Sequence, residues 1–209
     1  MSNKCEIITV SKEQIIQLQA GAKSFRQAFY VLFESMTKPD DGGIKFNDGD
    51  LMSVLGTIGC LSIELYLKFL SVILSFNDSK KEGVHIKCHS LDKLFEDIAI
   101  HYPQKANEIL NDIDKFYSKT PFNFIDFLDS IKEGFIDWRY AYSKGDLHYN
   151  LNHLSSVLNA LETISNDLCV PISKSLTEAN LKKNNQQSMT FDDINSIECE
   201  IFPKCSEDD

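Results

Sequence analysis

The sequence predicts an all-α fold: an up-and-down bundle of five to six helices, with a short β-ribbon formed at the termini. Apolar residues recur at spacings of three and four along most of the 209 residues, which is the period of one helix face. The long helical stretches have no strand-like runs between them. Apolar residues make up 43% of the chain and charged residues 25%, so wholesale disorder is excluded.

The first helix is expected from Ser11 to about Met36. Ser11 and Gln14 have the spacing of a capping box, in which each side chain bonds to the backbone amide of the other residue. One face of this helix then carries an apolar stripe: Ile15, Leu18, Ala22, Phe25, Phe29, Leu32 and Met36. Residues 1–10 form an N-terminal extension with a strand-like run, CEIITV.

The second helix is expected from Asp48 or Asp50 to about Phe76, and its apolar length imitates a membrane span. Glu64 and Lys68 interrupt it, and an ionised group costs about 3 kcal/mol at a bilayer centre. The polar residues share one narrow stripe: Ser53, Thr57, Cys60, Glu64, Lys68, Ser71 and Ser75. A helix with one polar edge belongs inside a bundle, so we expect a core helix and no membrane partner.

Shorter helices should follow along the chain. Ser90 is a candidate cap for a third helix, and Pro103 should separate it from a fourth. Thr120 followed by Pro121 suggests the start of a fifth, which should run to about Tyr142. Polar stretches predict loops at 37–49 and 77–87.

The sixth helix should run from about residue 147 until Pro171 ends it. We therefore expect a helical bundle over residues 11–172 and a polar, partly disordered tail over residues 173–209. A strand-like run, SIECEIF, lies in this tail. It is the candidate partner of the N-terminal run in a two-stranded ribbon.

Charge and cysteine content narrow the class of protein. The chain has 31 acidic and 21 basic residues, a net charge of −10, which disfavours strong non-specific binding to nucleic acid or anionic membranes. Its six cysteines include no CxxC pair, so we expect no metal site and no cofactor. No signal peptide is visible, and the cysteines are expected to be reduced thiols in a cytoplasmic protein.

The two arginines are candidates for chemistry because every other basic residue is lysine. A guanidinium offers a planar fork for a carboxylate or phosphate and stays charged. Arg26 and Arg139 each lie four residues after a residue of the predicted apolar helix face, Ala22 and Phe135 respectively. This spacing places both arginines at the edge of the core. Two alternatives remain open: a structural ion pair, for example of an arginine with Asp137 or Glu64, or a ligand or catalytic role.

Arg139 and His148 flank a predicted turn near Gly145. In an antiparallel helix hairpin, positions on either side of the turn approach one another. Arginine can hold phosphate charge while histidine moves a proton near neutral pH. The alternative is that His148 is an ordinary histidine in the first turn of a helix.

Glu64 and Lys68 are spaced for an ion pair along one helix, in the favourable order. Because the helix is apolar, a charge there must be matched. The pair could fix the packing register, or it could line a polar binding groove. Cys88 and His89 are adjacent, which suggests either a metal or thiol site or simply a loop cysteine beside a capping histidine.

Three segments together resemble a known family. They are SIELYLKFL at 62–70, HSLDKLFEDI at 89–98 and FIDWRYAYS at 135–143. Their order and spacing resemble HEPN domains over about residues 50–145. The resemblance implies a compact helical bundle that is usually dimeric. Many HEPN proteins are metal-independent ribonucleases of toxin–antitoxin or antiviral systems, and others are inactive RNA-binding or protein-binding modules.

The resemblance also implies roles for individual residues. Arg139 and His148 would be catalytic, whereas Glu64, Lys68, His89, Asp137 and Tyr140 would contribute to binding. Arg139 and His148 are separated by more residues than in the active family motif. We therefore expect a non-catalytic module that binds RNA or protein, most simply a homodimer, in a defence or toxin–antitoxin setting. The alternative is a metal-independent endoribonuclease.

Overall fold

The computed structural model describes residues 6–37, 48–79, 82–117, 122–132 and 150–186. Within these residues the fold is all-α, with six helices and one small two-stranded sheet. The chain divides into two compact units, Met1–Cys169 and Val170–Asp209. The candidate sites described below lie in the first unit, and the described part of the second unit is the C-terminal portion of α8.

Helix α1 spans Lys12–Thr37 and begins as the sequence predicts. The backbone N–H of Ser11 donates to the Gln14 side chain at 2.8 Å, and the Gln14 N–H donates to the Ser11 hydroxyl at 3.4 Å. The capping box is therefore confirmed. It satisfies amides that the first turn would otherwise leave unbonded.

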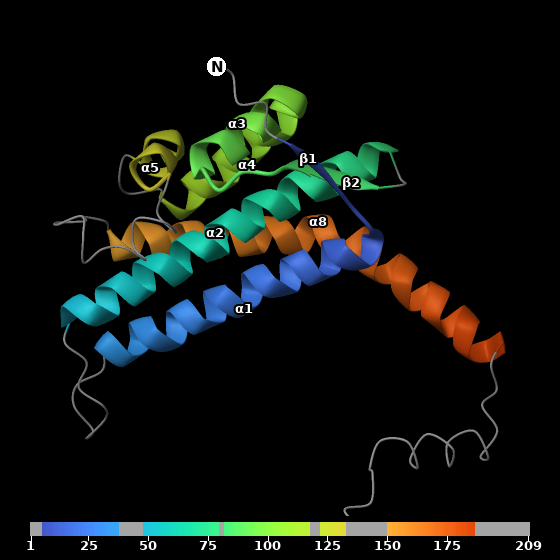
Figure 1. Cartoon of the computed structure of the whole chain (residues 1–209), viewed down its shortest axis with the longest axis horizontal. Coiled ribbons are helices and arrows are strands. Elements are labelled where there is room, and N and C mark those ends of the chain that lie inside the picture. The colour runs from blue at the N-terminus through green and yellow to red at the C-terminus, as the bar shows by residue number, and fades with distance from the viewer. Residues whose placement is uncertain (1–5, 38–47, 80–81, 118–121, 133–149, 187–209) are drawn as a thin grey trace, which may run out of the picture. The chain divides into compact units, whose positions relative to one another are not determined.

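Helix α2 spans Asp48–Ser79 and runs along α1 through the middle of the first unit (Figure 1). Among the described residues it is the one helix long and apolar enough to cross a bilayer, but 72% of that apolar window is buried inside the protein. Side chains such as Tyr66, Leu67 and Phe69 are fully buried. The prediction of a core helix is confirmed in this fold.

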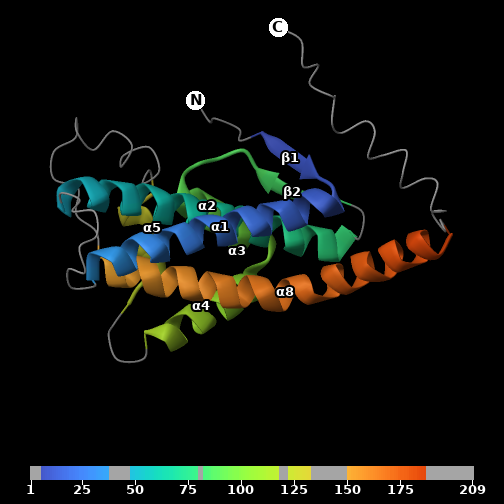
Figure 2. The ribbon, with the colours of Figure 1, turned by 90° about the horizontal axis from the view of Figure 1, so that it is seen from below.

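Helix α8 spans Leu151–Gln186, and its part in the first unit packs against α1 (Figure 2). The Gln19 side chain donates to the carbonyl of Ser165 at 3.0 Å, and the Tyr30 hydroxyl donates to the carbonyl of Ser155 at 2.7 Å. The predicted end of this helix is wrong, because α8 continues through Pro171. An internal proline costs a helix about 3 kcal/mol through one lost hydrogen bond and a steric clash, but residues that favour helices, Leu, Glu, Ala and Lys, recur after it in KSLTEANLKK.

Strand β1, Ile7–Val10, pairs antiparallel with β2, Gly83–Ile86, so that Ile7 lies opposite Ile86 and Val10 opposite Gly83. The predicted ribbon exists, and among the described residues its second strand is β2. β2 comes from the expected loop at 77–87, whereas the run at 196–202 lies outside the described residues. Hydroxyl groups of α2 hold β2 in place: the N–H of Val84 donates to the Ser75 hydroxyl at 2.6 Å.

Helices α3, Leu91–His101, and α4, Pro103–Phe116, meet at Pro103 as expected. The fifth helix was predicted to start too early, and it does not run on unbroken, since α5 spans Phe124–Ser130; the predicted end near Tyr142 lies outside the described residues. Its cap is Asn123, whose side chain accepts from two backbone amides, so the expected start at Thr120 and Pro121 lies before the helix. The chain turns after α5, and the carbonyl of Lys132 accepts from the N–H of Leu91 at the start of α3.

Candidate functional site

The structure brings together three of the seven residues predicted as site residues. Glu64 and Lys68 lie on α2, and His89 lies in the short segment between β2 and α3. The other four, Asp137, Arg139, Tyr140 and His148, lie outside the described residues. We refer to the three that meet as the Glu64 site.

Lys68 and His89 both contact the same carboxylate oxygen of Glu64. The Lys68 ammonium donates to Oε1 of Glu64 at 2.6 Å, and Nδ1 of His89 is 2.9 Å from the same atom. The side chain of Glu64 is 3% exposed, that of Lys68 13% and that of His89 60%. The site thus runs from a buried carboxylate to an exposed imidazole ring.

The second carboxylate oxygen of Glu64, Oε2, is buried and accepts no hydrogen bond from the described part of the chain. A buried polar atom without a partner costs about 1–3 kcal/mol. Buried polar atoms in protein cores are usually hydrogen-bonded, and among the described residues Oε2 of Glu64 is an exception. Such departures concentrate at functional sites.

Hydrogen bonds of the neighbouring residues Cys88 and Ser90 hold the segment that carries His89 in place. Cys88 and Ser90 contact each other through the cysteine sulfur, and the Ser90 hydroxyl donates to Asp92 at 2.5 Å. Ser90 is the N-cap residue of α3, but its side chain bonds to Asp92 and not to a backbone amide. Among the described residues no cluster of histidine, cysteine or carboxylate side chains could hold a metal ion.

The contact with Glu64 fixes the tautomer of His89. A carboxylate only accepts hydrogen bonds, so Nδ1 of His89 carries the proton. In the neutral ring the lone pair then resides on Nε2. An imidazole oriented by a carboxylate is suited to proton transfer or to binding a polar ligand.

The C-terminal half of the polar stripe predicted on the second helix, from Glu64 to Ser75, faces β2 and the start of α3. Beyond Lys68, the Ser71 hydroxyl lies 3.3 Å from the carbonyl of Val84 and 3.4 Å from the carboxylate of Asp97. The Ser75 hydroxyl also contacts Val84. The stripe therefore joins the Glu64 site to a second polar region at the C-terminal end of α2.

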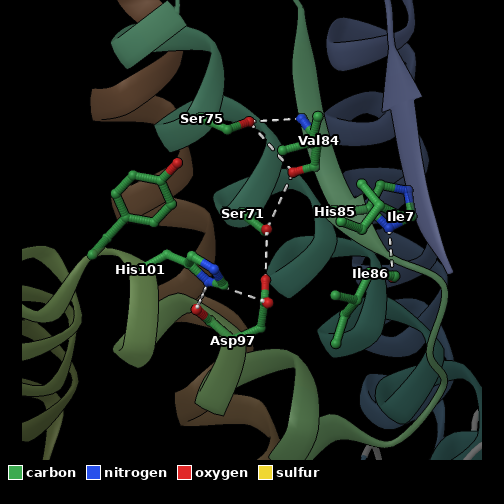
Figure 3. Close-up of a pocket in the computed structure, with 9 residues that line it drawn as sticks. Ile7, Ser71, Ser75, Val84, His85, Ile86, Asp97 and His101 are labelled. Carbon is green, nitrogen blue, oxygen red and sulfur yellow. Dashed lines mark hydrogen bonds and ion pairs between the residues drawn. The ribbon is translucent and has the colours of Figure 1, made fainter. Parts of the chain in front are cut away.

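A small pocket lies at this second region (Figure 3). Asp97 and His101 of α3 form one wall, and their side chains are 3.4 Å apart. His85 of β2 is buried, and its Nδ1 is 2.7 Å from the carbonyl of Ile86. No partner for His85 or His101 was evident from the sequence, because the ribbon and α3 meet only in the tertiary fold.

Arg26 forms a structural ion pair between α1 and α8. Its guanidinium lies 2.9 Å from the carboxylate of Glu162, donates to Asn159 at 2.6 Å, and stacks 4.7 Å from the centre of the Tyr30 ring. Arg26 therefore has the structural role that the sequence left open, and its ion-pair partner is Glu162 rather than the suggested Asp137 or Glu64. The sequence alone did not indicate Glu162, since the pairing depends on how α8 lies against α1.

Comparison of the chain with protein-family models, with curated proteins and with solved structures finds no match. What the protein does must therefore be inferred from its own residues. The Glu64 site provides the strongest basis, since it joins buried charge, an unused acceptor and an exposed ring.

Proposed function

We propose that the chain is a HEPN-like interaction module that binds a second protein chain, in the first place another copy of itself, through the surface around the Glu64 site. The observation that carries this proposal is the convergence of Lys68 and His89 on one oxygen of a buried carboxylate. The HEPN resemblance of the segments that carry these three residues supports it.

A binding role fits the energetics of the site. Burying a charge pair is often no better for stability than packing apolar residues of the same size, so stability alone is a weak reason to keep Glu64 and Lys68. The buried carboxylate holds the exposed His89 ring in one orientation. A surface group that is already ordered loses less entropy when a partner docks.

A protein partner is favoured over RNA because of the charge balance. The net charge of −10 opposes the phosphate contacts that supply most affinity for nucleic acid. At the Glu64 site the charge of Lys68 is already matched by the carboxylate. Little positive charge remains there to attract a phosphate backbone.

Light scattering over a concentration series tests this proposal. The wild-type protein should be dimeric, and His89→Ala should weaken the dimer by roughly tenfold or more because the proposed interface includes His89. Lys115→Ala serves as the control, because Lys115 is an exposed residue of α4 away from the Glu64 site. A strict monomer at high concentration, or equal dimerisation of the wild-type and His89→Ala proteins, would refute self-association through this surface.

The second candidate function is metal-independent RNA cleavage with Arg139 and His148. One observation favours it: the Glu64 site holds a second imidazole, that of His89, oriented for proton transfer. The test is cleavage of RNA in the presence of a chelator, with Arg139→Ala, His148→Ala and His89→Ala compared with the wild type. Activity that is equal in all four proteins would count against every one of these residues, and absence of cleavage by the wild type would favour the module.

A further inference from the structure

The pocket beside β2 has an anionic group that lacks a close partner. Both contacts of the Asp97 carboxylate are 3.4 Å long, one from the Ser71 hydroxyl and one from Nδ1 of His101. Charge-assisted hydrogen bonds are usually about 2.7–2.9 Å. Nδ1 of His101 makes its short contact, 2.9 Å, with the backbone carbonyl of Asp97 instead. The carboxylate side chain is 18% exposed, so it is partly desolvated and still under-coordinated.

His85 of β2 also lines the pocket, and its ring offers an acceptor (Figure 3). Nδ1 of His85 donates to the carbonyl of Ile86, which leaves the lone pair on Nε2. Burial lowers the pKa of His85, so the ring is neutral at pH 7. The nearby charge of Lys68 acts in the same direction, but Lys68 is itself paired with Glu64.

Two carboxylates, those of Asp78 and Asp97, act on the Tyr102 hydroxyl at this end of the pocket. Burial raises the pKa of the Tyr102 phenol, and the carboxylates of Asp78 and Asp97 raise it further. The phenol therefore keeps its proton. Two carboxylates acting on one hydroxyl produce a potential that favours a cation over an anion.

The remaining walls are apolar. Ile7 of β1 and Val84 and Ile86 of β2 line the pocket. Its volume is about 90 Å³, which suits a few heavy atoms. Ile7 and His101 are more than half exposed, so the pocket opens to solvent between β1 and α3.

We propose that this pocket binds a primary alkylammonium group. The ammonium would replace the two long contacts of Asp97 with short charge-assisted bonds, and its alkyl chain would lie against the three isoleucine and valine side chains. Such a group can come from a free small amine or from a lysine side chain of a protein partner. The chemistry recognised is the same in both cases.

A titration followed by amide NMR shifts at constant ionic strength tests the proposal. The probes are n-butylammonium, Nα-acetyl-lysine amide, and n-butanol as the neutral control. n-Butylammonium should shift the amides of β2 and α3 around the pocket, and n-butanol should not. Binding of the lysine amide as well would identify a lysine side chain as an acceptable source, whereas binding of n-butylammonium alone would identify a free amine.

Three variants, one of them a control, locate the binding. Asp97→Asn should weaken n-butylammonium binding by roughly tenfold, whereas Glu96→Gln removes the same charge from the adjacent position of α3, outside the pocket, and should leave binding unchanged. Ile7→Lys, at the exposed rim, should also weaken binding because it supplies an ammonium that competes for Asp97. The proposal is overturned if n-butylammonium does not bind, if n-butanol binds equally well, or if Ile7→Lys and Asp97→Asn both bind like the wild type.

Discussion

Glu64 and His89 are 25 residues apart in the sequence, yet Nδ1 of His89 lies 2.9 Å from Oε1 of Glu64. This contact joins the middle of α2 to the segment that leads into α3. Lys68, one turn further along α2, binds the same oxygen. The Glu64 site is therefore a product of helix packing and not of a contiguous motif.

Removing one member of the buried ion pair should destabilise the protein more than removing both. Lys68→Met leaves Glu64 buried with only His89 as a partner, and should lower the free energy of unfolding by about 3 kcal/mol. The double variant Glu64→Leu, Lys68→Met replaces the pair with apolar side chains and should lose less. Urea denaturation measures both values. A double variant that is less stable than Lys68→Met would show that the pair itself contributes net stability.

The same glycine-to-alanine change should have opposite effects on α1 and α2. A Cβ atom at Gly59 of α2 would lie 2.5 Å from the Leu154 side chain of α8, so Gly59→Ala should destabilise the protein by about 1–3 kcal/mol through overpacking. At Gly21 of α1 the nearest atom would be at an ordinary 3.7 Å. Gly21→Ala should stabilise by about 0.5–1 kcal/mol because alanine is the better helix former. Thermal unfolding of the two variants distinguishes these signs, and a Gly59→Ala protein as stable as the wild type would contradict the close approach of α2 and α8.

The start of α8 depends on the side chain of Asn150. Its Oδ1 accepts from the backbone amides of Asn152 at 2.9 Å and His153 at 3.3 Å. Asn150→Ala should therefore lower the free energy of unfolding by about 1 kcal/mol. Asn150→Asp keeps the acceptor and should lose little, which makes it the matched control in chemical denaturation. Equal losses in both variants would argue against the cap.

His85 should make stability fall as the solution is acidified. Burial lowers its pKa below the ordinary 6.5, so between the lowered value and 6.5 the unfolded chain binds a proton that the folded protein does not. The free energy of unfolding therefore falls as the pH drops through this window and is fully retained above it. His85→Asn keeps a side-chain donor for the carbonyl of Ile86 but cannot titrate. It should lose less stability than the wild type between about pH 7.5 and about pH 5.5, as measured by urea denaturation, and an unchanged pH dependence would rule out this contribution.

The helical spacing of apolar residues predicted the fold class and the core position of α2, and the spacing of Ser11 and Gln14 predicted the capping box of α1. Each of these features depends on residues within a few turns of one another. The Glu64–Lys68 pair was predicted for the same reason. The ribbon was only half predicted: the N-terminal strand was recognised, but β2 was mistaken for a loop. A four-residue strand such as GVHI has almost no periodic signal, and its place is set by hydroxyl groups of α2 and by pairing with β1.

The predicted helix boundaries were less accurate than the predicted helices themselves. α5 starts later than Pro121 suggested, and α8 continues past Pro171. Local propensity fixes where a helix is favoured, whereas packing and capping by neighbouring segments decide where it stops.

Local side-chain patterns were thus sufficient to predict that this chain forms a helical bundle with a charged pair on its central helix. Only the packed fold brought His89 onto Glu64, Glu162 onto Arg26, and Asp97 together with His85 into one pocket. The physical reason is that these contacts join residues distant in the chain. Their geometry depends on how whole helices dock, which nearest-neighbour spacing does not encode.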